Sequence, residues 1–303
     1  MKNWLLRFYH GLPLIRELRG LKAESSGLAE HRRLLEATAV VQALAALKAG
    51  HERYRDPARL LAHGAQYWSQ NYEDGMIAEI FQRIGTTSQT FLEVGVGDGR
   101  ENNTTALLSA GWKGWWIEGD PAACAAIAGS LRSMPETARR LKVRQAFVSP
   151  ENIAGLLAEL GVPEEVDLFS LDIDLNTYHV WAALTAFRPR VVVVEYNAAF
   201  PPGQVWINPL QANGAWDYSQ TFGASLKAFE LLGTRFGYSL VGCDLIGINA
   251  FFVRNDLVND DFVSPFTSEN HYEPPRYYLK YRFAHAAKFA VESHQEKNSK
   301  GAA

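Results

Sequence analysis

The sequence predicts an α/β fold whose seven-stranded sheet is mostly parallel and ends in an antiparallel hairpin. From residue 90 onward, short apolar runs alternate with helical patterns, as in a succession of βα units. The first run, TFLEV at 90–94, passes directly into a glycine-rich turn at 95–99, and a helical pattern follows that turn. The last two runs follow each other with no helix between them, so we expect them to pair antiparallel.

Each expected strand is rich in β-branched or other apolar residues and lies between turn signals. These strands are 90–94, 114–118, 142–148, 166–171, 190–195, 238–244 and 248–254. The expected helices of this region begin at residues that suit a first helical turn. They are 103–110, 121–132, 151–160, 176–186 and 220–232. Upstream, LAEHRRLLEATAVVQALAALK at 28–48 predicts a helix, and apolar residues between 76 and 81 recur at helical spacing.

The elements divide the chain into three parts. These are an N-terminal helical extension at 1–65, a cofactor-binding domain at 66–256, and a C-terminal extension at 257–303 whose tail we expect to be disordered. Residues 1–22 are basic and apolar, and a linker is expected at 24–27. The first 22 residues either contact a membrane or partner peripherally, or pack as an arm on their own domain or on a second copy in a homo-oligomer.

The charge and the cysteine content exclude several classes of protein. The 303 residues carry a net charge of -3, which gives no general attraction to nucleic acid. Cys124 and Cys243 are too few for a disulfide framework or a zinc site, and they favour a reducing, cytoplasmic location. The sequence holds no apolar run of the length that spans a bilayer, so we expect any membrane contact to be peripheral.

The glycine turn predicts a cofactor site. Gly95, Gly97 and Gly99 let the backbone turn sharply and approach a ligand, and Glu93 lies two residues before the first of them. A dinucleotide motif would need a further glycine where Arg100 stands. The pattern instead resembles the first motif of class I S-adenosylmethionine-dependent methyltransferases. That resemblance implies a Rossmann-like fold and S-adenosyl-L-methionine as the cofactor, bound by Glu93 and the three glycines.

An acidic residue at the end of the second expected strand supports this interpretation. Glu118 lies 19 residues after Gly99, where a carboxylate can accept hydrogen bonds from both hydroxyls of a ribose. The alternative is a tight strand-to-helix turn with a surface glutamate. Upstream, Ser69, Gln70 and Asn71 precede a helix close to the first strand. They either close over the methionine end of the cofactor or cap that helix.

Acidic residues at the ends of the fourth and fifth expected strands predict the reaction site. Asp172 and Asp174 follow one strand and Glu195 ends the next, so these side chains are expected at one edge of the sheet. Carboxylates of this kind suit Mg²⁺, and the three form a predicted metal site. For removal of the acceptor proton, His179 is the first candidate general base and Asp172 the second. Alternatively, Asp174 or Asn176 caps the next helix and His179 hydrogen-bonds within the core.

The loop at 197–218 is long for a connection in a compact domain, and such loops are commonly functional. It interleaves aromatic and amide side chains, which suit stacking on a sugar and hydrogen bonding to it. We expect contacts with the acceptor from Asn197, Trp206, Trp216 and Tyr218. The alternative is a surface excursion whose aromatic side chains pack onto the sheet.

A family resemblance extends over residues 66–256. Its segments are SQNYEDGMIAEIF, FLEVGVGDGRENNT, WWIEGD, LFSLDIDLNTYHVW, RVVVVEYN, FGASLKAFELL and LVGCDLIGINAFFVR. Together they resemble FkbM-like class I methyltransferases of bacteria, a family associated with polysaccharide biosynthesis. The resemblance implies O-methylation of a sugar or glycan hydroxyl, assisted by Mg²⁺. The D-x-D motif is also similar to the metal site of sugar O-methyltransferases, which usually has aspartates where this chain has Glu195 and Asn197.

Two alternative functions stay open at the level of the sequence. One is N- or carboxyl methylation of a small metabolite. The other is a cofactor-binding but catalytically silent subunit of a glycan-assembly complex. The sequence does not decide among these functions, because the residues that indicate the cofactor say little about the group that receives the methyl.

Overall fold

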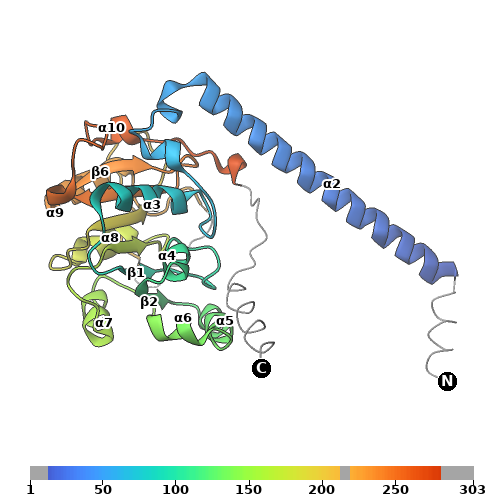
Figure 1. Cartoon of the computed structure of the whole chain (residues 1–303), viewed down its shortest axis with the longest axis horizontal. Coiled ribbons are helices and arrows are strands. Elements are labelled where there is room, and N and C mark those ends of the chain that lie inside the picture. The colour runs from blue at the N-terminus through green and yellow to red at the C-terminus, as the bar shows by residue number, and fades with distance from the viewer. Residues whose placement is uncertain (1–12, 212–218, 281–303) are drawn as a thin grey trace, which may run out of the picture. The chain divides into compact units, whose positions relative to one another are not determined.

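The computed structural model describes residues 13–211 and 219–280, and the chain divides into two units after Gly50. The first unit is α2 (Pro13–Gly50), a single helix of 38 residues (Figure 1). The expected linker at 24–27 is wrong, because the helix runs through it. The flanking turns are rich in leucine and alanine, whose helix propensity carries the helix through these weaker helix formers. The helices of the described ranges include none that is long and apolar enough to cross a bilayer.

The second unit is built on a seven-stranded sheet with the order β3-β2-β1-β4-β5-β7-β6. Its strands are β1 (Thr90–Val94), β2 (Lys113–Glu118), β3 (Leu141–Gln145), β4 (Leu168–Leu171), β5 (Val191–Glu195), β6 (Tyr238–Cys243) and β7 (Asn249–Arg254). Strands β1 to β5 pair parallel, and β7 pairs antiparallel with β5 and β6. The predicted architecture is confirmed: a Rossmann-like, mostly parallel seven-stranded sheet that ends in an antiparallel hairpin.

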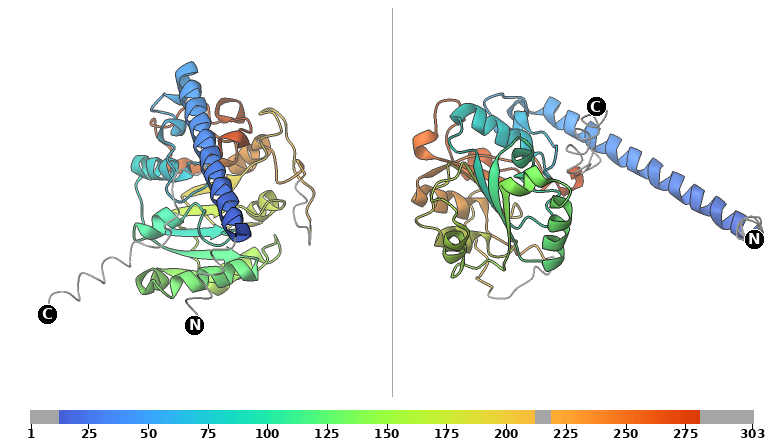
Figure 2. Two further views of the ribbon diagram at one scale, coloured as in Figure 1. Left: turned by 90° about the vertical axis from the view of Figure 1, so that its right-hand side faces the viewer. Right: turned by 60° about the horizontal axis from the view of Figure 1, so that its bottom comes forward.

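Helices cover both faces of this sheet (Figure 2). The described α-helices of this unit are α3 (Glu73–Ile84), α4 (Thr105–Ser109), α5 (Pro121–Leu131), α6 (Pro135–Arg140), α7 (Ile153–Leu160), α8 (Thr177–Ala183), α9 (Leu226–Phe236) and α10 (Ser268–His271). Successive strand residues point to opposite faces, so Leu92 joins the core formed with α7, α8 and α9, whereas Phe91 joins the core formed with α3, α4 and α5. Short 3₁₀ helices are η1 (Glu52–Tyr54), η2 (Leu60–His63), η3 (Asn255–Leu257) and η4 (Tyr277–Leu279).

Three helices of this unit differ from the sequence-based expectation. The short helices α6 and α10 were not predicted, and α9 begins later than the expected residue 220. Ser225 sets the start of α9, since its hydroxyl accepts a hydrogen bond from the Ala228 N–H. The preceding Ala224 bridges to Ile207, which holds the residues before α9 against the long loop.

The segments on either side of residues 66–256 pack together within the second unit. This unit begins at His51, earlier than the predicted boundary at residue 66. Glu273, which is fully buried, pairs with Arg53 at 2.7 Å and with Arg276 at 2.7 Å. Tyr54 donates a hydrogen bond to the same carboxylate at 3.1 Å. These buried contacts tie η1 to the residues before η4. The expected disordered tail lies beyond the described residues.

We expect His271 to make the protein less stable in mild acid. Burial lowers the pKa of this imidazole from 6.5 to about 4, and its Nε2 lies 3.1 Å from the Val263 carbonyl oxygen. Between those values the unfolded chain binds a proton that the folded chain does not. The free energy of unfolding therefore falls as pH decreases, by about 2 kcal/mol at pH 5 from this residue.

Urea unfolding at pH 7.5 and pH 5 tests this expectation, with His271→Gln as the comparison. Glutamine can still donate a hydrogen bond to a carbonyl oxygen but does not titrate in this range. The variant should lose less stability than the wild-type protein between the two pH values. An identical pH dependence in both proteins would show that His271 is not the group responsible.

Candidate functional site

The glycine turn after β1 is shaped by a very close approach of two strand ends. Gly95, Gly97 and Gly99 have φ angles of +85°, +54° and +73°, which glycine adopts without strain. A Cβ on Gly95 would lie 1.6 Å from the carbonyl oxygen of Asp172, which follows β4. Only glycine fits there, and the close approach brings the predicted cofactor turn beside the predicted metal residues.

Glu93 anchors the residues that follow the glycine turn through hydrogen bonds to its carboxylate. Its buried carboxylate accepts hydrogen bonds from Asn102 Nδ2 at 2.7 Å and from the backbone N–H groups of Asn103 and Thr104 at 2.9 and 3.0 Å. Burial raises its pKa to about 7, against the lowering effect of these donors. The carboxylate thus fixes the segment between the turn and α4. Glu93 also lines a hollow beside the turn, and its predicted contact with the cofactor stays a prediction.

A hollow of about 630 Å³, hollow 1, opens at the carboxyl ends of β1, β2 and β4. Glu118 lines it at the end of β2, as the sequence predicted. The Gly97 N–H donates to Glu118 Oε2 at 2.7 Å, and the Asp120 N–H donates to Glu118 Oε1 at 2.8 Å. Each carboxylate oxygen retains a further lone pair, so both can accept a hydrogen bond from a ligand in hollow 1.

Phe147 is a site residue that the sequence analysis missed. It follows β3, is 73% exposed and lines hollow 1. A Cβ on Gly119 would lie 3.0 Å from its ring, so the ring packs over that glycine. An exposed aromatic face in a hollow offers a stacking surface for a planar ring. Its only signal in the sequence was an aromatic residue near the end of the strand predicted at 142–148, which in the structure ends at Gln145.

A second hollow of about 390 Å³, hollow 2, lies on the other side of the glycine turn. Gln70 and Asn71 line it, together with the turn and Asp172. Ser69 does not line it, since this buried residue caps the start of α3: its hydroxyl accepts a hydrogen bond from the Asp74 N–H at 3.1 Å. Two of the three predicted methionine-end residues therefore face a hollow, and the third follows the capping alternative.

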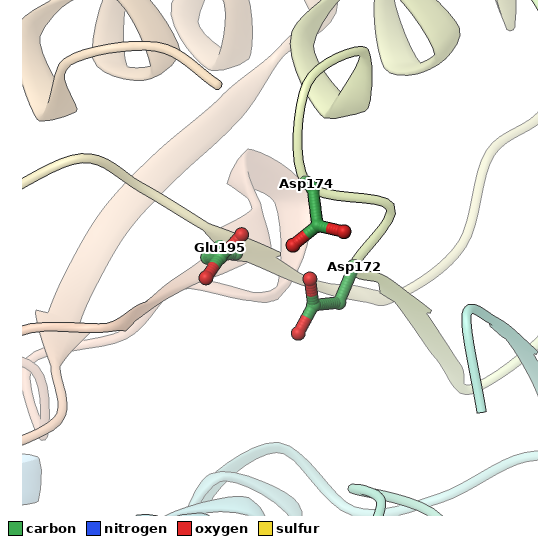
Figure 3. Close-up of side chains that lie close together, drawn as sticks. All are labelled: Asp172, Asp174 and Glu195. Atoms are coloured by element: carbon green, nitrogen blue, oxygen red, sulfur yellow. The ribbon is translucent and has the colours of Figure 1, made fainter. Parts of the chain in front are cut away.

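The three predicted metal residues come together. Asp172, Asp174 and Glu195 each offer a carboxylate oxygen, and these oxygens lie within 4.8 Å of one another. Figure 3 shows their carboxyl groups converging from the end of β4, the turn after it and β5. Burial and the neighbouring acids raise the pKa of Asp172 to about 6 and that of Glu195 well above its usual value. Crowded carboxyl groups of this kind share protons unless a cation lies between them.

One oxygen in this carboxylate trio (Asp172, Asp174 and Glu195) lacks a partner. Glu195 Oε2 is buried and has no hydrogen-bond partner. A buried acceptor without a donor is costly, and a bound cation would remove that cost. The residues present therefore fit a hard divalent ion, for which carboxylate oxygens are the preferred ligands.

His179 and Asn197 line neither hollow. His179 Nε2 donates to the Asn208 carbonyl oxygen at 2.7 Å, which ties α8 to the long loop. Asn197 is fully buried, and its Nδ2 donates to the carbonyl oxygens of Gln220 and Phe222 at 2.7 and 3.0 Å. Both side chains anchor loops, which for His179 matches the alternative of a hydrogen bond within the protein. The roles of general base and acceptor contact stay predictions.

The remaining predicted acceptor residues lie in the long loop. Trp206 is half-buried and stacks on Phe200, with ring centroids 4.3 Å apart and planes inclined by 15°. This internal stacking matches the alternative in which the aromatic residues of the loop pack within the protein. Trp216 and Tyr218 lie outside the described residues.

Comparison with known proteins finds distant structural similarity only. No family model matches the chain, and no curated protein matches it. The glycopeptide N-methyltransferase MtfA complexed with S-adenosyl-L-methionine is 13% identical over 59% of this chain and 86% of its own, with a TM-score of 0.37. Magnesium protoporphyrin IX methyltransferase ChlM of Synechocystis PCC 6803 is 10% identical over 60% of this chain and 81% of its own, with a TM-score of 0.41. The precorrin-6y C5,15-methyltransferase of Geobacter metallireducens GS-15 is 13% identical over 63% of this chain and 92% of its own, with a TM-score of 0.38.

Proposed function

We propose that this chain is an S-adenosylmethionine-dependent O-methyltransferase that acts on a sugar or glycan hydroxyl with the assistance of Mg²⁺. The observation that carries the proposal is the meeting of hollows 1 and 2 at Gly95 and Asp172, directly beside the carboxylate trio. A cofactor lying across the two hollows would present its reactive centre next to those carboxylates. Both cysteines are free, which suits the proposed cytoplasmic location.

The hollows suit the two ends of S-adenosylmethionine. In hollow 1, Glu118 is placed to accept hydrogen bonds from the ribose hydroxyls, and Phe147 offers a face for the adenine ring. In hollow 2, the polar side chains of Gln70 and Asn71 suit the methionine end. The glycine turn between the hollows allows the backbone to lie close to the ligand at its centre.

The carboxylate trio suits a divalent ion near the acceptor. Asp172, Asp174 and Glu195 would hold it through oxygen atoms, which are the ligands that Mg²⁺ prefers. When bound, such an ion supplies a Lewis acid that orients neighbouring oxygens of a sugar and lowers the pKa of a hydroxyl. The vicinal oxygens of a sugar would match this arrangement better than an amine.

The reaction is the in-line displacement of the sulfonium methyl by an acceptor oxygen, in which an O–C bond forms, the C–S bond breaks and the hydroxyl proton leaves. Asp172 lines both hollows, and we assign its carboxylate to orient the acceptor hydroxyl and receive its proton. We assign His179 no part in this step, because it lines neither hollow and its Nε2 donates to the Asn208 carbonyl oxygen.

Calorimetric titration tests the proposal. S-adenosylmethionine is titrated into chelator-treated protein with and without Mg²⁺, and NAD serves as the control ligand. We expect micromolar binding of S-adenosylmethionine, no response to NAD, and an added heat with Mg²⁺. A panel of sugars is then screened for formation of S-adenosylhomocysteine. Binding without turnover on any acceptor would favour the catalytically silent subunit, and turnover on amines without Mg²⁺ would favour N-methylation.

Glu118→Gln is expected to weaken binding of S-adenosylmethionine at least about tenfold, since a hydrogen bond to a charged group contributes about 1.5 kcal/mol or more. In the wild-type protein the Gly97 N–H donates to Glu118. The substitution would turn an amide N–H toward this donor and so remove that hydrogen bond as well. Glu159→Gln is the matched control, because Glu159 pairs with Arg144 on the exposed surface. Equal affinities in both variants would contradict the assigned ribose contact.

A further inference from the structure

Two loops meet beside the carboxylate trio. One is the turn at 172–176 that follows β4, and the other is the loop between β5 and α9, of which residues 196–211 and 219–225 are described. Asn176 joins them, because its Nδ2 donates to the Gln211 carbonyl oxygen at 2.8 Å and its Oδ1 accepts from the Gln211 N–H at 3.1 Å. We call this pair of hydrogen bonds the Asn176–Gln211 clamp. It ties the lining of hollow 1, to which Asn176 belongs, to a residue 35 positions along the chain.

Asn176 does not cap the helix that it precedes. It occupies the N-cap position of α8, where asparagine is among the preferred residues, yet its side chain makes no capping hydrogen bond. Both ends of its amide bind Gln211 instead. Within the first turn of α8, His179 Nε2 also donates to this loop, at the Asn208 carbonyl oxygen. The side chains at the start of α8 therefore hold the loop rather than the end of their own helix.

The turn that the clamp holds carries Asp174 in an unusual conformation. Asp174 has a φ of +55°, in the left-handed region that residues other than glycine rarely occupy. The direction of its side chain depends on that backbone conformation, and the carboxylate converges with those of Asp172 and Glu195 (Figure 3). Such a conformation persists where the surrounding structure holds it. Contacts that fix this turn therefore also fix one ligand of the proposed ion.

The loop supports Asp174 at a second point, Gly223. A Cβ on Gly223 would lie 3.3 Å from the Asp174 carbonyl oxygen, so the two backbones are close together. The Gly223 carbonyl oxygen accepts the Asn208 N–H at 2.9 Å, which joins the two sides of the loop to each other. Together they contact the turn at Asp174 and at Asn176. A displacement of the loop would remove both supports.

We propose that Asn176 is a positioning residue for the divalent ion, and that the clamp couples the loop after β5 to ion binding by the carboxylate trio. This inference rests on the proposed function, in which the trio holds the ion. With the loop clamped, Asp174 keeps the left-handed conformation that directs its carboxylate toward the other two. Coupling between two equilibria is reciprocal, so an ion bound by the trio stabilises the loop at 206–211.

Ion binding without any acceptor tests this role. Electron paramagnetic resonance of Mn²⁺ measures the affinity of the wild-type protein and of Asn176→Ala. The variant should bind Mn²⁺ about 10–100-fold more weakly, the usual effect of removing a residue that orients a metal ligand. Its affinity for S-adenosylhomocysteine should change less than about threefold, because the proposed contacts at Glu118 and Phe147 are kept. Mg²⁺ should slow amide hydrogen exchange at 206–211 in the wild-type protein but not in the variant.

Asn152→Ala is the matched control. Asn152 also occupies an N-cap position without capping, in this case that of α7. Its amide accepts the Ser149 N–H at 2.8 Å and donates to the Phe147 carbonyl oxygen at 2.8 Å, so it makes the same two kinds of hydrogen bond within its own loop. This variant should bind Mn²⁺ as tightly as the wild-type protein does.

Gly223→Ala disturbs the same turn from the other side of the loop, and it provides a second measurement if circular dichroism shows that Asn176→Ala does not fold. It should also weaken Mn²⁺ binding. Unchanged Mn²⁺ affinity in either folded variant, or equal losses of Mn²⁺ and S-adenosylhomocysteine affinity in Asn176→Ala, would overturn the positioning role and leave the proposed function standing. A wild-type protein that binds S-adenosylhomocysteine but no Mn²⁺ would overturn the ion of the proposed function, and this inference with it.

Discussion

Gly95→Ala is expected to destabilise the second unit by more than about 3 kcal/mol and to abolish binding of S-adenosylmethionine. The added Cβ would lie 1.6 Å from the Asp172 carbonyl oxygen, and the backbone at Gly95 has a φ of +85°. Neither strand end can retreat easily, because the Asp172 N–H donates to the Val94 carbonyl oxygen at 3.0 Å. Relief of the overlap would require β1 and β4 to separate at the point where the two hollows meet.

Gly97→Ala measures the cost of a positive φ alone, without the steric overlap that an added Cβ causes at Gly95. Gly97 also has a positive φ of +54°, but a Cβ there would meet no atom within 4 Å. We therefore expect a loss of only about 1–2 kcal/mol, the usual cost of this conformation for a residue with a side chain. Urea unfolding followed by circular dichroism measures both variants. Similar losses for the two would show that the contact between Gly95 and Asp172 does not control stability.

The comparison of these glycines also shows what the sequence can and cannot predict about the fold. The strands were predictable because buried β-branched runs such as 191–194 have a strong local signal. The glycine pattern was equally visible. The sequence did not show that Gly95 must avoid the carbonyl oxygen of a residue as distant in the chain as Asp172, because that contact depends on the pairing of β1 with β4.

Only part of the candidate site could likewise be predicted from the sequence. The convergence of Asp172 and Glu195 followed from a general rule, since neighbouring parallel strands end at one edge of a sheet. The orientations of His179 and Asn197 did not follow from any such rule. Their hydrogen-bond partners are carbonyl oxygens in loops, at Asn208 in the case of His179, and loop conformation has no periodic signal in the sequence. Asn249, which lines hollow 2, was missed for a different reason, because its hydrogen-bond partner Glu73 begins a helix far away in the chain.

Asp172→Asn is expected to lower kcat/KM by about 10²–10⁴, the range that a positioned proton acceptor contributes. Asp172 differs from the other members of the carboxylate trio because it lines both hollows, whereas Asp174 lines only hollow 1 and Glu195 lines neither. Asparagine keeps the size of the side chain but removes its charge. Its amide would also turn a donor toward the space in which the trio is proposed to hold a cation.

Two measurements on Asp172→Asn distinguish its proposed roles. Formation of S-adenosylhomocysteine on the best sugar of the acceptor panel reports turnover, and electron paramagnetic resonance of Mn²⁺ reports ion binding without any acceptor. Asp256→Asn is the control, because Asp256 pairs with Arg254 at an exposed position beyond β7, at the opposite edge of the sheet. Loss of Mn²⁺ binding and turnover with S-adenosylmethionine affinity retained would assign the carboxylate to the acceptor side of the reaction. Full Mn²⁺ binding in this variant would show that Asp172 is not needed to hold the ion. Full turnover would show that its carboxylate does not receive the acceptor proton, although it is the one carboxylate of the trio that lines both hollows.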